Sequence, residues 1–117
     1  MPQVGIAGRP VGAGHPPFVI AEAGINHNGQ LELALRMVQV AKPSGADAIK
    51  FQTFTAEGLV GDPKVTYTYQ SQGQQVTESM QEMFRRVEFS PDEWRAIKQR
   101  CDETGILFLS TPQNVAD

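Results

Sequence analysis

A lysine and a glutamine two residues apart are the side chains in this sequence best suited to binding a ligand. Lys50 and Gln52 lie in the run 48–53, which has the pattern of a β-strand. Side chains on a strand alternate between its faces, so both point to one side while Ile49 and Phe51 point to the other. A lysine beside packed apolar groups needs an anion or a polar opening, because an unpaired buried ammonium is costly. The pair therefore indicates an anion site; the alternative is an edge strand with Lys50 in water.

Two further apolar runs end in polar side chains in the same way. Residues 18–23 contain Glu22 near their end, and residues 106–112 end in two hydroxyl residues and a proline. Runs of this kind are typical of parallel strands, and ligands bind at the C-terminal ends of such strands. We therefore expect a parallel sheet whose strands follow chain order. The side chains expected to converge at one end of it are Glu22, Lys50, Gln52, Ser110 and Thr111.

Two helices between these runs are expected to cover the sheet. Residues 31–42 carry an apolar stripe at helical spacing, and Pro43 and Gly45 end that helix. Residues 90–93 (Ser-Pro-Asp-Glu) form a capping box that starts a second helix, and Gly105 stops it. Its predicted buried stripe is Trp94, Ile97 and Cys101.

The segment before the second helix predicts two less regular elements. Residues 77–87 indicate a short extra helix with its methionines and Phe84 on one face, and methionines at this spacing are usually core residues. Residues 55–75 are polar and rich in glycine, glutamine and tyrosine, which predicts a long loop over the strand ends. Such a loop is typical of a functional lid, with disorder as the alternative.

Composition excludes several classes of function. A chain of 117 residues with 40% apolar content is one ordinary domain or a piece of a larger protein. The net charge of −3 argues against nucleic acid as the main partner, and no apolar stretch indicates a membrane span or a signal peptide. Cys101 is expected to be an inert buried thiol, which favours a reducing, cytoplasmic location.

The two histidines do not indicate a metal site. His15 lies beside two prolines in a predicted surface turn and is assigned no role. His27 follows the first strand and could be a ligand, a base or a residue that braces its loop. Bracing is the favoured interpretation, because one histidine without a second histidine or cysteine nearby does not make a metal site. No metal ligands are therefore assigned in this chain.

Three motifs, in this order and spacing, resemble the start of the sialic acid synthase family (N-acetylneuraminate synthase-like). They are IAEAGINHNG at 20–29, GADAIKFQT at 45–53 and FLSTP at 108–112. Residues 4–6 and 10–12 resemble the family's N-terminal hairpin, and residues 79–83 resemble its short helix. The resemblance covers nearly the whole chain.

The resemblance implies an α/β fold that is part of a TIM (β/α)8 barrel. Residues 1–14 would be a short N-terminal β-hairpin, and residues 15–117 would hold the first three β/α units, with a third helix beginning at 114–117. A full barrel needs about 250 residues. We therefore expect an incomplete barrel, lacking the remaining units and the family's C-terminal antifreeze-like domain.

The resemblance also implies an activity, a cofactor and site roles. Family enzymes condense phosphoenolpyruvate with N-acetylmannosamine or a related amino sugar, use divalent manganese or magnesium, and form homodimers. Glu22 matches the catalytic glutamate that handles protons or steadies a cationic intermediate. Lys50 matches the lysine that holds phosphoenolpyruvate, Gln52 the glutamine that contacts the sugar, and Thr111, next to Ser110, the threonine beside phosphoenolpyruvate. The metal-binding histidines would come from the second half of the barrel.

Some features of the sequence depart from the family, and two other interpretations stay open. Gln113 stands where the family usually has phenylalanine, and Pro43-Ser44 replaces a more helical sequence. One alternative is an independent flavodoxin-like module that binds a phosphorylated ligand, although residues 24–29 have the wrong spacing for a common nucleotide fingerprint. The other is a non-catalytic fragment that pairs with itself or with another chain. In each case we expect the isolated chain to be inactive as a synthase, and we expect a synthase fragment to self-associate.

Overall fold

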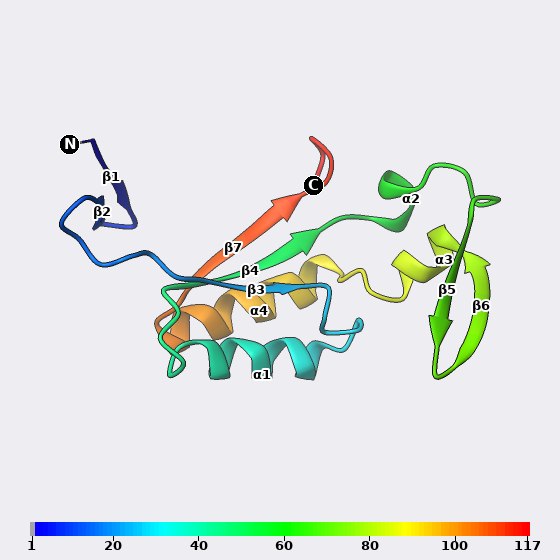
Figure 1. The fold of residues 1–117 in the computed structure, drawn as a ribbon, viewed down its shortest axis with the longest axis horizontal. Helices are drawn as coiled ribbons and strands as arrows, with labels where there is room; N and C mark the ends of the chain where they lie inside the picture. Colours follow the sequence, from blue (N-terminus) through cyan, green and yellow to red (C-terminus); the bar gives the residue numbers. More distant parts are fainter. Residues whose placement is uncertain (1) are drawn as a thin grey trace.

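A parallel three-stranded sheet forms the centre of the computed structural model, which describes residues 2–117. Its strands are β3 (Ile20–Gly24), β4 (Ala48–Thr53) and β7 (Leu107–Pro112), in the spatial order β3-β4-β7. All three run in the same direction (Figure 1). The predicted parallel sheet in chain order is therefore confirmed, and β4, which carries Lys50, is its central strand.

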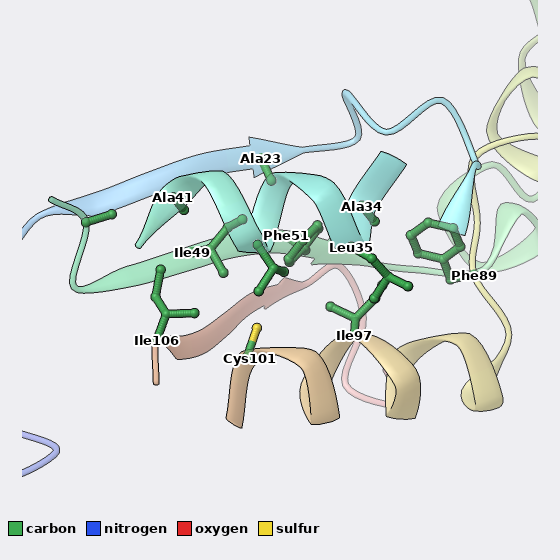
Figure 2. Packing of buried hydrophobic residues seen from close by; sticks show 12 residues of the cluster. Ala23, Ala34, Leu35, Ala41, Ile49, Phe51, Phe89, Ile97, Cys101 and Ile106 are labelled. Atoms are coloured by element: carbon green, nitrogen blue, oxygen red, sulfur yellow. The ribbon is translucent and has the colours of Figure 1, made fainter. Parts of the chain in front are cut away.

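Two helices cover one face of this sheet. They are α1 (Leu31–Ala41) and α4 (Pro91–Thr104), which pack against each other as well as against the strands. Figure 2 shows Ile49 and Phe51 of β4 in one cluster with Leu35 of α1 and with Ile97 and Cys101 of α4. Phe51, Ile49 and Ile97 are almost completely buried, and burying each such side chain contributes about 1.5–3 kcal/mol. The core therefore lies on the helix side of the sheet.

The ends of α4 agree with the sequence. The Ser90 hydroxyl accepts a hydrogen bond from the Glu93 backbone N–H, while the Glu93 carboxylate accepts one from the Ser90 N–H, so the predicted capping box is confirmed. Gly105 adopts φ 78° at the other end, a left-handed conformation that favours glycine. Burial raises the pKa of the Cys101 thiol to about 11, which fits the predicted inert residue.

The segment between β4 and α4 is more ordered than predicted. Where the sequence indicated a loop at 55–75, the structure has α2 (Ala56–Leu59), β5 (Thr66–Ser71) and the first two residues of β6 (Gln74–Ser79). β5 and β6 form an antiparallel hairpin whose two tip residues, Gln72 and Gly73, both have positive φ. Such a turn matches the twist of a two-stranded ribbon, so polar composition alone did not exclude strands here.

A short helix follows the hairpin. α3 (Met80–Arg85) is shorter than the predicted 77–87, because residues 77–79 belong to β6 and Ser79 caps the helix. Its buried residue is Gln81, whose amide donates to the Val60 carbonyl at 2.9 Å. Figure 1 places the hairpin and α3 beyond the C-terminal ends of β3 and β4. This insert is therefore attached at the same end of the sheet as the polar strand ends.

A second antiparallel pair of strands lies at the start of the chain. β1 (Gln3–Ile6) and β2 (Arg9–Gly12) pair with each other, and Arg9 forms an ion pair with Asp47, the residue before β4. The same carboxylate accepts a hydrogen bond from the Val19 N–H at 2.8 Å, just before β3. These contacts tie β1 and β2 to the N-terminal end of the sheet.

The last residues form a turn after β7. Residues 114–117 form a turn in which the Asp117 N–H donates to the Asn114 carbonyl at 3.1 Å, and the predicted start of a third helix there stays a prediction. Within residues 2–117, no helix combines the length and the apolar character that crossing a bilayer requires.

Candidate active site at the C-terminal ends of the strands

An ion pair between neighbouring strands forms the centre of the candidate site. Glu22 of β3 and Lys50 of β4 are register partners, and Lys50 Nζ lies 3.1 Å from Glu22 Oε2. The Lys50 side chain is 37% exposed and the Glu22 side chain is 52% exposed. An ion pair this exposed contributes at most about 1 kcal/mol to stability. Both charged groups are therefore open to a ligand at little energetic cost.

Alternation along β4 decides which face the site occupies. Ile49 and Phe51 point into the core under the helices, so Lys50 and Gln52 point away from it. The predicted separation of the two pairs is confirmed. The alternative of an edge strand is wrong, because β4 is flanked by β3 and β7.

Register also decides which hydroxyl of β7 joins this face. Thr111 pairs with Gln52, and Leu109 pairs with Lys50, so both lie on the face away from the helices. Ser110 pairs with Phe51, and its hydroxyl forms a hydrogen bond with that of Thr53. The structure therefore does not bring the Ser110 side chain to the face of Lys50, contrary to the expected convergence. Two adjacent strand residues cannot point to the same side.

A bulge shapes the end of β3. Glu22 pairs with Lys50, but Gly24, two residues later, pairs with Phe51, so β3 has one extra residue there. Bulges of this kind are frequent beside active sites, where they re-aim side chains. Gly24 has φ 56°, which a residue with a Cβ adopts only with strain.

Three polar side chains gather over Gly24. A Cβ built on this glycine would lie 3.5 Å from Glu22 Oε1, 3.7 Å from Gln52 Nε2 and 3.9 Å from Asn26 Nδ2. Asn26 was missed by the sequence reasoning. The sequence pattern that could have indicated it is an asparagine in the turn directly after a strand that ends in a carboxylate.

His27 braces the turn that carries Asn26. Its ring is fully buried and stacks on Phe89 at 4.2 Å, and its Nδ1 accepts a hydrogen bond from the Gly29 N–H at 3.0 Å. Burial lowers the pKa of His27, an effect that the Glu93 carboxylate partly opposes. The neutral ring therefore carries its proton on Nε2, which has no hydrogen-bond partner within residues 2–117. The favoured interpretation as a bracing residue agrees with these contacts.

The described part of the chain offers no ready metal site. Across residues 2–117, no group of three or more histidine, cysteine, aspartate or glutamate side chains could hold a metal ion. His15 Nε2 lies 3.1 Å from Gln3 Oε1 at an exposed position. The polar groups at the strand ends are thus one carboxylate, one ammonium, two amides and one hydroxyl. This set suits an anionic or hydroxyl-rich small molecule.

Known proteins share this arrangement of sequence and fold. A profile of the NeuB family matches residues 37–117. The chain is 41% identical over 103 residues to N,N'-diacetyllegionaminic acid synthase of Legionella pneumophila, covering 88% of this chain and 29% of that protein. It is 38% identical over 104 residues to human N-acetylneuraminate-9-phosphate synthase, covering 89% and 29%.

A solved structure agrees with these relatives. The N-acetylneuraminic acid synthetase of Leptospira borgpetersenii, determined in complex with citrate, superposes with a TM-score of 0.79 at 33% identity. The match covers 98% of this chain and 35% of that one, and the chain spans about 29% of the length of the curated relatives named above. From the family profile, the relatives and the shared fold together, the chain belongs to the NeuB family of sialic acid synthases.

Proposed function

We propose that this chain is the part of a nonulosonic acid synthase that binds phosphoenolpyruvate and an amino sugar at the first strands of a TIM barrel. The observation that carries the proposal is the Glu22–Lys50 pair on neighbouring parallel strands, with Gln52 and Thr111 on the same face. The names of the similar synthases support the reaction class. The proposed substrates are phosphoenolpyruvate and N-acetylmannosamine or a related acylated amino sugar. The proposed location is the cytoplasm.

Each residue has a role that its chemistry supports. Lys50 supplies a point charge to the carboxylate or phosphate of phosphoenolpyruvate, and Thr111 lies on the adjacent strand, two residues beyond the register level of Lys50. Gln52 offers a neutral donor and acceptor to the sugar. Glu22 handles a proton or steadies positive charge as the enol carbon attacks the sugar aldehyde and water adds to the resulting cation. Phosphate then leaves.

A divalent metal, manganese or magnesium, is part of the proposal for the complete enzyme. The residues described here do not form a set of ligands for it. Its ligands would therefore come from outside this chain, and none of the roles given above to the residues of this chain depends on the metal.

A substitution at Lys50 tests the proposal. In the full-length synthase, Lys50→Ala is expected to raise the KM for phosphoenolpyruvate about 10- to 100-fold, because it removes a charge-assisted hydrogen bond to a ground-state anion. The KM for the amino sugar should change much less. Steady-state kinetics with each substrate varied in turn gives both values. Lys42→Ala, at an exposed position just after α1, is the matched control.

The outcome that contradicts the proposal is equally specific. A full-length protein that forms no nonulosonic acid from phosphoenolpyruvate and any acylated mannosamine would overturn the reaction. An active protein whose KM for phosphoenolpyruvate is the same with and without Lys50 would overturn the site.

The isolated chain is expected to self-associate. The sheet face away from the helices carries Ile20, which is 45% exposed, together with Leu107 and Leu109, and within residues 2–117 β3 and β7 each have an edge that no strand covers. Exposed apolar faces and open parallel edges favour pairing between copies. Light scattering coupled to size exclusion at increasing concentration should therefore give a rising molar mass. A cooperative monomer at high concentration would instead favour the independent-module interpretation.

A further inference from the structure

The end of β3 brings three polar groups together over one glycine. Glu22 Oε1, Gln52 Nε2 and Asn26 Nδ2 all lie within 4 Å of the position that a Gly24 Cβ would take. They come from two strands and from the turn after β3. Because the glycine has no side chain, their polar ends can approach one another there. A single small ligand can therefore touch all three groups.

The position of Asn26 is fixed by its turn. Its backbone N–H donates to the Ala23 carbonyl at 3.0 Å, and the next residue, His27, is fully buried against Phe89. Gly29 lies directly against the Arg86 backbone, which fixes the other side of the turn. This hydrogen bond and the packing of its neighbours therefore hold the backbone of the exposed Asn26 beside the site, which lowers the entropy lost on binding.

The amides of Asn26 and Gln52 are free to bind a ligand. Neither makes a hydrogen bond to another protein group within residues 2–117, whereas Lys50 and Glu22 are engaged with each other. An amide offers both donors and an acceptor and carries no charge. Two amides next to a charged pair suit a ligand with hydroxyl or acylamino groups beside its reacting carbon.

We propose that Asn26 is a specificity residue that works with Gln52 to hydrogen-bond the hydroxyl and acylamino groups of the amino sugar. The inference rests on the proposed function. It extends that function to Asn26, which belongs to the motif at 20–29 but was assigned no role from the sequence. Lys50 serves the anionic substrate, and the two amides serve the neutral one. Gly24 is the residue over which the two amides meet Glu22, the ionic partner of Lys50.

Kinetics of an Asn26 variant in the full-length synthase tests the inference. Asn26→Ala is expected to raise the KM for the amino sugar about tenfold, the effect of losing one hydrogen bond to a neutral group, while the KM for phosphoenolpyruvate stays within about twofold. Asn28→Gly is the matched control: Asn28 is exposed on the same turn and has φ 55°, so glycine fits its backbone. Its KM values should not change. An unchanged sugar KM in Asn26→Ala, or equal changes for both substrates, would overturn the inference.

Direct binding separates this inference from the proposed function. If the wild-type enzyme turns out not to catalyse the condensation, saturation-transfer NMR with N-acetylmannosamine decides the role of Asn26 alone. Saturation transfer to the sugar from the wild type, weakened in Asn26→Ala and kept in Asn28→Gly, supports the contact without the reaction. No transfer from the wild type, or equal transfer from all three proteins, overturns it.

Discussion

Replacing Glu22 with glutamine is expected to lower the kcat of the full-length synthase by about 10²- to 10⁴-fold, the usual contribution of a positioned acid or base. Glutamine keeps the size of the side chain and its acceptor oxygen, but it removes the negative charge and the ability to take up a proton. The KM for phosphoenolpyruvate should change little, because Lys50 remains and no longer has Glu22 as an ionic partner. Steady-state kinetics with both substrates measures the separation between kcat and KM.

The control for this substitution is Glu32→Gln. Glu32 lies in the first turn of α1 at an exposed position, and its carboxylate takes no part in the site. Its kcat should equal that of the wild type. If the kcat of Glu22→Gln were within threefold of the wild-type value, Glu22 would have no catalytic role and would serve only as the ionic partner of Lys50.

Replacing Gly29 with alanine is expected to destabilise the protein by about 2–5 kcal/mol, the sum of left-handed backbone strain and overpacking. Gly29 has φ 74°, and a Cβ there would overlap the Arg86 carbonyl oxygen and lie 3.0 Å from its carbonyl carbon. Backbone atoms cannot move aside as a flexible side chain can. The turn at 25–29 and the segment at 86–89 would have to separate, which would also expose His27. The midpoint of urea unfolding measures the loss.

Gly105→Ala is the control that separates backbone strain from steric overlap in the urea unfolding of Gly29→Ala. Gly105 has nearly the same φ, 78°, but a Cβ there would meet nothing within 4 Å. Only the strain component, about 1–2 kcal/mol, is expected in this variant. If Gly29→Ala lowers the unfolding midpoint no more than Gly105→Ala does, the close packing of the turn against Arg86 contributes nothing to stability.

The parts of the fold that sequence could predict are those with a strict period or a local hydrogen-bond pattern. Alternation along β4 was enough to place Lys50 and Gln52 opposite Ile49 and Phe51, and the capping box was enough to locate the start of α4. Both depend on residues close together in the chain. The same alternation, applied to β7, would also have separated Ser110 from Thr111.

The remaining features depend on contacts that no short pattern records. The β5–β6 hairpin has no apolar core of its own, so it lacks the alternation of apolar and polar residues that marks a half-buried strand. Asn26 follows directly on the bulge in β3 and the left-handed backbone of Gly24, which redirect the chain at the end of the strand. A bulge is a property of the pairing between two strands, and neither strand shows it alone.

The β5–β6 ribbon also bears on how this family can diversify. Its ladder pairs residues 66–71 with 74–79, so its backbone groups satisfy each other, and the Glu78–Arg86 ion pair and the Met80 N–H bond to the Val65 carbonyl hold its base. Adding or deleting two residues on each strand near the tip would keep the alternation of that ladder and its two-residue turn, and it would leave the buried core untouched. Natural insertions and deletions in this ribbon should therefore come in matched pairs, so that its reach beyond the strand ends varies between lineages while the Lys50 face stays constant.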